Sequence, residues 1–218
     1  MRLSVTGPGQ APGEIAALLV RRAGATTATP PYGRDVGKLH AEIDADLRAW
    51  IAAQHVFFVA TAPSGDAGHV NCSPKGGDTL RVVGPNCLAY LDRVGSGIET
   101  VAHVRQNGRI VVMFTALEGP PRILRLHGRG RVALPGSREF VDLLAHFGSA
   151  VQGVRAILAI DTARISDSCG FGVPLYRFEG ERDHLDKWAA KKGEAGIATY
   201  VREKNAHSLD GLSGLDPL

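Results

Sequence analysis

The sequence predicts a mainly antiparallel α+β fold, a barrel of about seven strands with two or three accessory helices. Three observations lead to this fold class. The 218 residues, of which 44% are apolar and 22% charged, suit one generous globular domain or one domain with extensions. Short β-like segments follow one another with Gly- and Asn-containing turns between them. No regular crossover helix separates these segments, which argues against a doubly wound parallel sheet.

The first part of the chain is expected to differ from the rest. Residues 1–34 are rich in Gly, Pro, Ala and Thr and end in TTATPPYGR, so they predict a flexible N-terminal arm, with a short helix over 14–22 as an option. From Asp35 onward, apolar residues recur every three and four positions, which predicts an amphipathic helix that begins the folded domain; these residues are Val36, Leu39, Ile43, Leu47, Trp50 and Ile51.

Four β-like segments follow this helix, and each ends in a turn cluster. The segments are 55–62, 69–74, 79–83 and 87–94, and the clusters after them read SGDAG, KGGD, GPN and GSG. A short helix is predicted over 98–106, because Asn107-Gly108 is a common C-terminal stop. The apolar run 109–117 predicts a strand covered on both faces, and EGPP at 118–121 turns the chain.

The second half of the chain begins with a clear alternation. Within 122–134, apolar residues and glycines alternate with Arg125, His127, Arg129 and Arg131, which predicts a strand with one packed face and one basic face. A helix over 137–147 with Ser137 as its N-cap and a strand over 154–166 follow. One or two helices are expected over 183–206. The predicted divisions are therefore the arm 1–34, a barrel domain 35–182, and a helical C-terminal extension 183–218 that packs on the barrel or on a partner chain.

Composition limits the cellular context and the partners. The longest uncharged apolar run, 15–20, is far too short to cross a bilayer, and Glu14 with several Pro and Gly interrupts any secretory signal, so we expect a cytoplasmic protein without membrane association. Cys72, Cys87 and Cys169 have neither C-x-x-C nor zinc-finger spacing, which predicts no disulfide framework and no metal site.

Basic residues point to an anionic small ligand rather than to nucleic acid. The net charge is only +3, but 19 of the 25 basic residues are arginine, whose planar side chain suits phosphate and carboxylate. A GC-rich genome would produce the same bias. No run of basic residues stands beside stacking aromatics, so a nucleic-acid surface is not expected.

The most informative stretch lies between 87 and 114. A predicted strand ends there, a Gly-Ser-Gly turn follows, and a predicted helix begins near Glu99 and Thr100. Backbone N–H groups, the Ser96 hydroxyl and the positive end of a helix dipole would then meet at one point, which favours an anion site. The alternative is that the glycines only form a turn and that Ser96 only caps the helix.

Several sequence blocks extend this interpretation, and they occur in order between about Gly37 and Pro174: SPKG, AYLD-x-x-GSG-x-ET-x-x-H, NGRI-x-x-MF and GPPRILRLHG. This run resembles the pyridoxamine 5′-phosphate oxidase-like family of FMN-binding split β-barrels. The resemblance implies a split barrel of six or seven strands, and a homodimer with FMN in a groove between the subunits. It also implies an oxidoreductase that transfers hydride or electrons to or from a small molecule.

The resemblance also implies which residues hold the cofactor. The flavin phosphate would be held by the segment from Asp92 to Thr100, and above all by Ser96, Gly97 and Thr100. The strand before the barrel turn would lie along the isoalloxazine ring through Asn71, Cys72, Ser73 and Lys75. A cation at Lys75 would stabilise negative charge on the reduced flavin, although a lysine before Gly-Gly is commonly a solvated turn residue.

Other candidates lie further along the chain. Arg122 and Arg125 follow the Gly-Pro-Pro turn and would reach a phosphate of FMN or substrate across the dimer, whereas Arg129 and Arg131 are expected on the solvent side. Trp188 would either stack on the partner's flavin or pack in the core. His103 is expected to be a packed histidine rather than a ligand or base, so no catalytic acid or base is identified.

The chain departs from true pyridoxamine phosphate oxidases at two places. It lacks a close counterpart of their Arg-rich C-terminal segment and ends in HSLDGLSGLDPL, and GSGIET replaces the Arg/Ser/Lys cluster of their phosphate loop. Both departures count against vitamin B6 oxidation. Three alternatives to an FMN oxidoreductase stay open: a deazaflavin-dependent reductase, a flavin- or haem-binding module without turnover, and a dimeric scaffold without a ligand.

Overall fold

The structure is a computed structural model that describes residues 37–148 and 152–215. The described residues belong to one compact unit, Asp35–Leu218. The expected N-terminal arm and its short helix lie outside the described residues. No helix in the described part of the chain is long and apolar enough to cross a membrane.

Eight antiparallel strands form one sheet, which confirms the predicted mainly antiparallel class. The hydrogen-bonded order is β3-β2-β6-β7-β8-β5-β4, and β1 pairs with β8. The strands are β1 (Leu39–His40), β2 (Phe57–Thr61), β3 (Asn71–Lys75), β4 (Leu80–Gly84), β5 (Cys87–Arg93), β6 (Arg109–Thr115), β7 (Ile123–Ala133) and β8 (Val154–Ser168).

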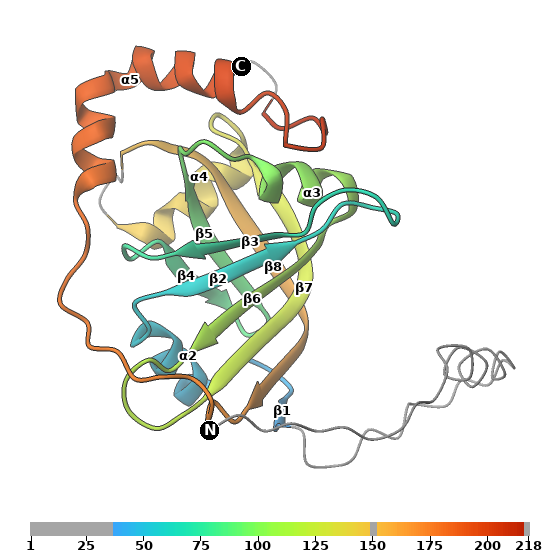
Figure 1. Cartoon of the computed structure of the whole chain (residues 1–218), viewed down its shortest axis with the longest axis vertical. Helices are drawn as coiled ribbons and strands as arrows, with labels where there is room; N and C mark the ends of the chain where they lie inside the picture. The colour runs from blue at the N-terminus through green and yellow to red at the C-terminus, as the bar shows by residue number, and fades with distance from the viewer. Residues whose placement is uncertain (1–36, 149–151, 216–218) are drawn as a thin grey trace, which may run out of the picture. The chain divides into compact units, whose positions relative to one another are not determined.

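The helices lie around the ends and one face of this sheet. They are α2 (Ala45–Ala52), α3 (Glu99–Asn107), α4 (Arg138–Leu144), the 3-10 turn η1 (Ala145–Phe147) and α5 (His184–Lys204). Figure 1 shows α2 near one end of the strands and α3 near the other, with the segment after α5 reaching α3. Helix α5 is kinked at Gly193, whose φ of 63° breaks the helical backbone into two parts.

The sheet curls into a barrel that is open along one line. Lys75 of β3 lies 3.4 Å from Asp92 of β5, although four strands separate β3 from β5 in the sheet order. Within the described residues, the edge strands β3 and β4 do not pair with each other, so the barrel is split there. We call this opening the seam.

The core fills the inside of the barrel because every second residue of each strand points inward. Val59, Leu88, Val112, Leu126 and Leu158 come from five different strands, and each is 0% exposed. Helix α2 closes one end with Leu47 and Ile51. A second apolar cluster lies outside the barrel under α4, so β5 and β8 are buried on both faces; it contains Ala89, Leu91, Ala133, Leu143, Phe147, Ile157 and Ala159.

The helix predicted from Asp35 is wrong in its first half. Leu39–His40 form β1 against β8, and the helix begins only at Ala45, where the Asp44 side chain caps it by accepting the N–H of Leu47 at 2.8 Å. Gly37, just before β1, allows the chain to lie directly against β8. Its φ is 74°, and a Cβ there would lie 1.5 Å from the carbonyl oxygen of Asp167, so the backbones of the first residues and of β8 are in close contact.

The other predicted strands and helices within the described residues are confirmed, with ends that differ by a few residues. The sequence predicts a strand over 109–117 that is covered on both faces, but Val111 and Met113 on the outer face of β6 are only partly buried. Ser137 is the N-cap of α4 and accepts the N–H of Phe140 at 3.1 Å. The packed face of β7 lies as predicted, with Leu124 and Leu126 both 0% exposed. The three cysteines are free thiols.

Candidate functional site

Three of the predicted cofactor residues line the inner side of the seam. Asn71, Ser73 and Lys75 alternate along β3, so their side chains point to the same face. The strand register places Lys75 opposite Phe57 and Ser73 opposite Val59, which are both core residues of β2. Paired residues of an antiparallel sheet share a face, and the three polar side chains therefore extend the inside of the barrel toward the seam.

Charged residues meet at the seam in a ratio of two cations to one carboxylate. Asp92 is 1% exposed and accepts hydrogen bonds from Lys75 at 3.4 Å and from Arg155 at 2.8 Å. Arg155 also donates to the carbonyl oxygen of Gly95 at 3.3 Å. A buried carboxylate requires such partners, but one positive charge remains in excess at this place. This excess makes the seam attractive to an anion.

Uncharged polar groups link β3 to the start of α3. The Asn71 amide donates to Thr100 Oγ1 at 2.9 Å and to Thr61 Oγ1 at 3.3 Å, and the Ser73 hydroxyl donates to Asn71 Oδ1 at 3.0 Å. The predicted residues Asn71, Ser73 and Thr100 are thus one connected network. Together with Lys75, Asp92 and Arg155 they form what we call the seam cluster.

Two fully buried residues support the seam cluster from inside. His103 lies 3.0 Å from Thr61 through Nδ1, and its Nε2 has no partner within the described residues. Burial lowers the pKa of His103, against the opposing effect of Asp210 and Glu99, so the imidazole is neutral at neutral pH. Tyr90 lies under Lys75, whose Nζ is 6.0 Å from the ring centroid, and burial raises the pKa of this phenol.

The loop before α3 presents an uncapped helix start. The N-cap residue is Ile98, which makes no side-chain cap, so Ser96 does not cap the helix. Ser96 and Gly97 are exposed, and a Cβ at Gly97 would lie 2.4 Å from the Glu99 carboxylate. The Gly95 carbonyl is turned inward, where it accepts from Arg155 and, at 2.9 Å, from Asn205. Within the described residues no side chain caps the first turn of α3, and the Glu99 carboxylate beside Gly97 accepts the N–H of Leu209 at 3.2 Å.

The remaining predicted residues lie apart from this network. Cys72 points to the opposite face of β3 and is exposed. Arg122 pairs with Asp167 at 2.7 Å, and Arg125 donates to Ser168 at 3.0 Å. Trp188 packs edge-on against Tyr200 within α5, with ring centroids 5.1 Å apart. Within the described residues, none of these four side chains has a hydrogen bond, ion pair or ring contact with a side chain of the seam cluster.

The sequence analysis missed four residues of this region: Thr61, His103 as a partner of Thr61, Arg155 and Asn205. A signal existed for Arg155, because a charge at the start of the apolar run VRAILAI would be buried and so requires a carboxylate. Asn205 carries no such signal. It follows a polar helix, and only the folded chain brings it to Gly95, 110 positions earlier.

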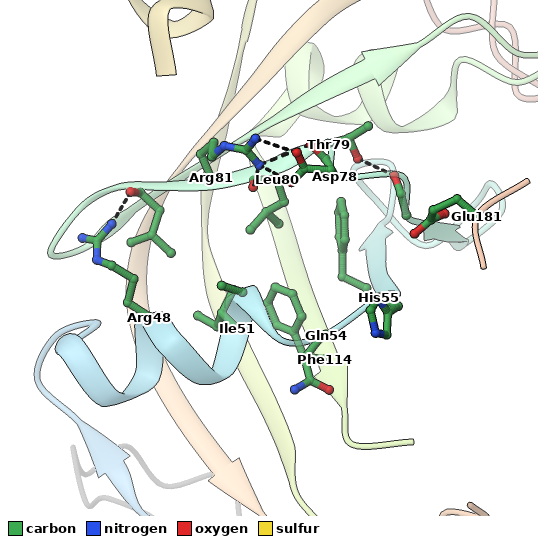
Figure 2. Close-up of a pocket in the computed structure, with 14 residues that line it drawn as sticks. Arg48, Ile51, Gln54, His55, Asp78, Thr79, Leu80, Arg81, Phe114 and Glu181 are labelled. Carbon is green, nitrogen blue, oxygen red and sulfur yellow. Dashed lines mark hydrogen bonds and ion pairs between the residues drawn. The ribbon is translucent and has the colours of Figure 1, made fainter. Parts of the chain in front are cut away.

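A cavity of about 450 Å³ adjoins the seam between α2 and the turn from β3 to β4 (Figure 2). It begins at Gly76, directly after Lys75, and its apolar walls include Ile51, Leu80 and Phe114. On its rim Arg81 pairs with Asp78 at 2.6 Å, and this hydrogen bond lowers the pKa of Asp78. Arg48 and Glu181 also line this cavity, so its charged residues are two cations and two carboxylates around an apolar floor.

The seam lacks the features of a metal centre. Among residues 37–148 and 152–215, no three His, Cys, Asp or Glu side chains gather as metal ligands would. Ammonium, guanidinium, amide and hydroxyl groups dominate the seam cluster instead, and the only carboxylate among its six members is already paired with two cations. Such a donor set suits an anionic organic ligand.

The chain is similar to several known proteins. No family model matches the chain. The chain is 36% identical over 188 residues to the pyridoxamine 5′-phosphate oxidase family protein ustO of Aspergillus flavus, covering 78% of this chain and 74% of that protein. Among solved structures, it is similar to HupZ of Group A Streptococcus, with a TM-score of 0.45 and 22% identity over 56% of this chain and 91% of that one.

A further similar structure is an FMN-binding protein from Syntrophomonas wolfei, with a TM-score of 0.43 and 17% identity over 60% of this chain and 85% of that one. The relation to ustO extends over most of both chains. Two of the sequence blocks that suggested the family, SPKG and AYLD-x-x-GSG-x-ET-x-x-H, lie on β3, β5 and α3, which contribute to the seam, and the other two lie mainly on β6 and β7. This chain therefore belongs to the pyridoxamine 5′-phosphate oxidase family.

Proposed function

We propose that this protein is an oxidoreductase that binds FMN at the seam and transfers hydride or electrons to or from a small molecule. The observation that carries the proposal is the excess positive charge of the seam cluster, where Lys75 and Arg155 share the single carboxylate of Asp92. An anionic, planar cofactor with many hydrogen-bond acceptors suits such a site.

The groups present fit FMN in two ways. Lys75 makes one hydrogen bond within the described residues, and at 3.4 Å it is long for a charge-assisted contact, so donors of its ammonium are available to a ligand. The uncapped start of α3, with Gly97 beside it, provides backbone donors for a phosphate. Lys75, Asn71 and Ser73 would hold the ring, and the loop from Ser96 to Thr100 would hold the phosphate.

The flavin, when bound, supplies the redox chemistry of the proposed reaction. The chain's own groups orient the cofactor and adjust its electrostatics. Lys75 favours negative charge on the ring, and it is 24% exposed, so it can adapt to a ligand. Asp92 keeps Lys75 near the seam, and Arg155 is the second cation that pairs with the Asp92 carboxylate. No residue of this cluster is proposed as a catalytic acid or base.

The cavity shown in Figure 2 is the proposed place for the substrate. It adjoins Lys75 through Gly76, and its floor of Ile51, Leu80 and Phe114 suits the apolar part of a small molecule.

We also propose that the protein is a homodimer with the cofactor at the interface. The outer face of β2 and β6 supports this, because Phe58 pairs with Met113 and Ala60 with Val111 there, and all four residues are only partly buried. An apolar sheet face of this kind is a common protein contact. Sedimentation velocity at several concentrations tests it, and a monomer at micromolar concentration would contradict it.

The decisive experiment is the visible absorption spectrum of the purified protein, followed by mass spectrometry of the ligand released on denaturation. Bound FMN, or saturable binding of added FMN, is expected. A deazaflavin or haem spectrum would retain the barrel and replace the cofactor. A colourless protein that also fails to bind added FMN would overturn the proposal and leave a scaffold. If FMN is bound, a panel of electron donors and acceptors then separates an enzyme from a module without turnover.

A further inference from the structure

A second cavity, of about 750 Å³, lies on the outer side of the sheet near the C-terminal end of α2. Thr115 lines it and follows Phe114, whose side chain lies in the core, so Thr115 points outward. Its walls come from the end of α2, from the turn between β6 and β7, and from residues 176–178, which we call the strap. No member of the seam cluster lines this cavity.

The strap is fixed to the rest of the protein by three contacts. The N–H of Tyr176 donates to the carbonyl oxygen of Leu117 at 2.9 Å, and the N–H of Phe178 donates to Glu118 Oε1 at 3.1 Å. The Phe178 ring stacks on His55, with centroids 3.6 Å apart and planes 4° from parallel. The cavity is therefore a formed site of the size that small organic ligands use.

Three aromatic side chains contribute to the cavity walls. Trp50, Tyr176 and Phe178 all line it, and Tyr176 is 62% exposed and Phe178 41% exposed. Arg122 stacks on Trp50, with its guanidinium carbon 4.9 Å from the ring centroid. Planar ligands gain most from such walls, because ring stacking adds to the burial of apolar surface. A ring system is thus the favoured occupant.

One residue that lines the cavity has a buried polar atom without a partner in the described part of the chain. Thr115 is 8% exposed, and its hydroxyl makes no hydrogen bond within the described residues. Buried hydroxyl groups are nearly always hydrogen-bonded, and an unsatisfied one is costly. A ligand with an oxygen or nitrogen beside its ring would supply the missing partner.

Two charged side chains that line the cavity, Glu118 and Arg177, have no ion pair within the described residues. Arg122 is neutralised by Asp167; burial opposes ionisation of this carboxyl, but hydrogen bonds from His40, Lys38 and Arg122 lower its pKa overall. Glu118 also lines the cavity, with its Oε1 engaged by the strap. Arg177 is exposed on the rim and has no ion pair in the described part of the chain. An acidic group of a ligand would pair with Arg177.

From these contacts we propose that the strap cavity binds a planar aromatic carboxylate. Its ring lies against Trp50 and Tyr176, and its polar partners are the Thr115 hydroxyl and the Arg177 guanidinium. The site is separate from the seam, so it does not require that FMN be the cofactor.

The test uses isothermal titration calorimetry of the full chain with 2-naphthoate and with 2-naphthamide, which has the same rings without the charge. Saturable binding of 2-naphthoate, at least about tenfold tighter than that of the amide, is expected. Arg177→Gln removes most of this preference, and Thr115→Val weakens both ligands at nearly constant shape. The matched control is Arg182→Gln, which alters an exposed arginine outside the cavity.

Other results would overturn the proposal. These are no saturable heat with 2-naphthoate, equal affinity for the amide, or an unchanged affinity in Arg177→Gln. If a second copy of the chain covers the strap, the dimer will fail to bind the probe, which also overturns it. Lys75→Met separates the two sites: it is expected to weaken FMN and to leave 2-naphthoate unchanged, so failure at the strap cavity says nothing against the seam.

Discussion

The wall made of β7, β8 and β5 and the seam between β3 and β4 are built from opposite kinds of residue. The wall is apolar inside and largely covered outside, and Leu158 and Ile157 are each 0% exposed on its two faces. The seam joins charged and polar side chains that come from β3, β5, α3 and β8. The difference indicates that the wall mainly stabilises the fold, whereas the seam mainly provides groups for ligand binding.

The largest expected effect is on the wall. Leu158→Ala removes a fully buried side chain from the barrel interior and should lower the free energy of unfolding by about 2–5 kcal/mol, measured by urea denaturation. FMN affinity of the variant that is still folded should stay close to that of the parent. Val141→Ala, which alters a 61% exposed residue of α4, is the control and should change stability by less than about 0.5 kcal/mol.

The second prediction reverses this outcome at the seam. Lys75→Met should weaken FMN binding about tenfold or more, equivalent to about 1.4 kcal/mol, because it removes the only partly exposed cation of the seam cluster. Stability should change by less than about 1 kcal/mol, since Asp92 retains Arg155. Flavin fluorescence titration and urea denaturation measure the two effects. Lys191→Met on α5 is the control. A large loss of stability without a loss of FMN affinity in Lys75→Met would contradict the separate roles of the wall and the seam.

A third prediction concerns the loop that carries the phosphate donors. Asn205→Leu removes the hydrogen bond to the Gly95 carbonyl and should weaken FMN by about threefold to tenfold, as expected for one hydrogen bond. Riboflavin, which lacks the phosphate, should bind with unchanged affinity. Ser208→Ala loosens the same C-terminal segment without touching Gly95 and serves as the control. Equal losses for FMN and riboflavin would indicate general unfolding of the site instead.

The smallest expected effect is a pH dependence from His103. Burial is the main cause that lowers the pKa of His103 in the folded state. As the pH falls below the ordinary histidine pKa of about 6.5, the unfolded chain therefore binds more protons than the folded chain. Stability should therefore fall as the pH drops from 7.5 toward 5.5. Thermal melts should show a smaller fall in His103→Asn than in the parent, whereas His184→Asn, at an exposed position, should retain the parent's fall. Identical profiles for all three would exclude His103 as the cause.

The wall could be predicted from the sequence, because its information is local. Strict alternation in β7 placed Leu124 and Leu126 in the core, and Ser137 marked the start of α4. The error at the first helix has the same origin, since the spacing of Leu39 and Ile43 is compatible with a helix. Pairing of β1 with β8 and the cap at Asp44 decide otherwise, and the pairing depends on residues more than 120 positions away.

The seam could be predicted only in part. The family resemblance suggested Asn71, Ser73, Lys75, Asp92 and Thr100, and these five residues do lie together. Their partners Arg155 and Thr61 escaped notice because no local pattern marks a contact that arises only when a sheet closes. Arg122 illustrates the opposite case: a promising arginine after a turn is paired with Asp167, which is 45 positions away.

The last described residues bear on the order in which the molecule can be assembled during synthesis. Leu215 is 6% exposed within the same core cluster as Ile98, and its N–H donates to Asn205, which in turn holds Gly95. A growing chain that has not yet reached residue 215 has neither a complete core nor a fixed loop before α3. The barrel strands can pair earlier, but the proposed phosphate site is finished only after Leu215 has been added.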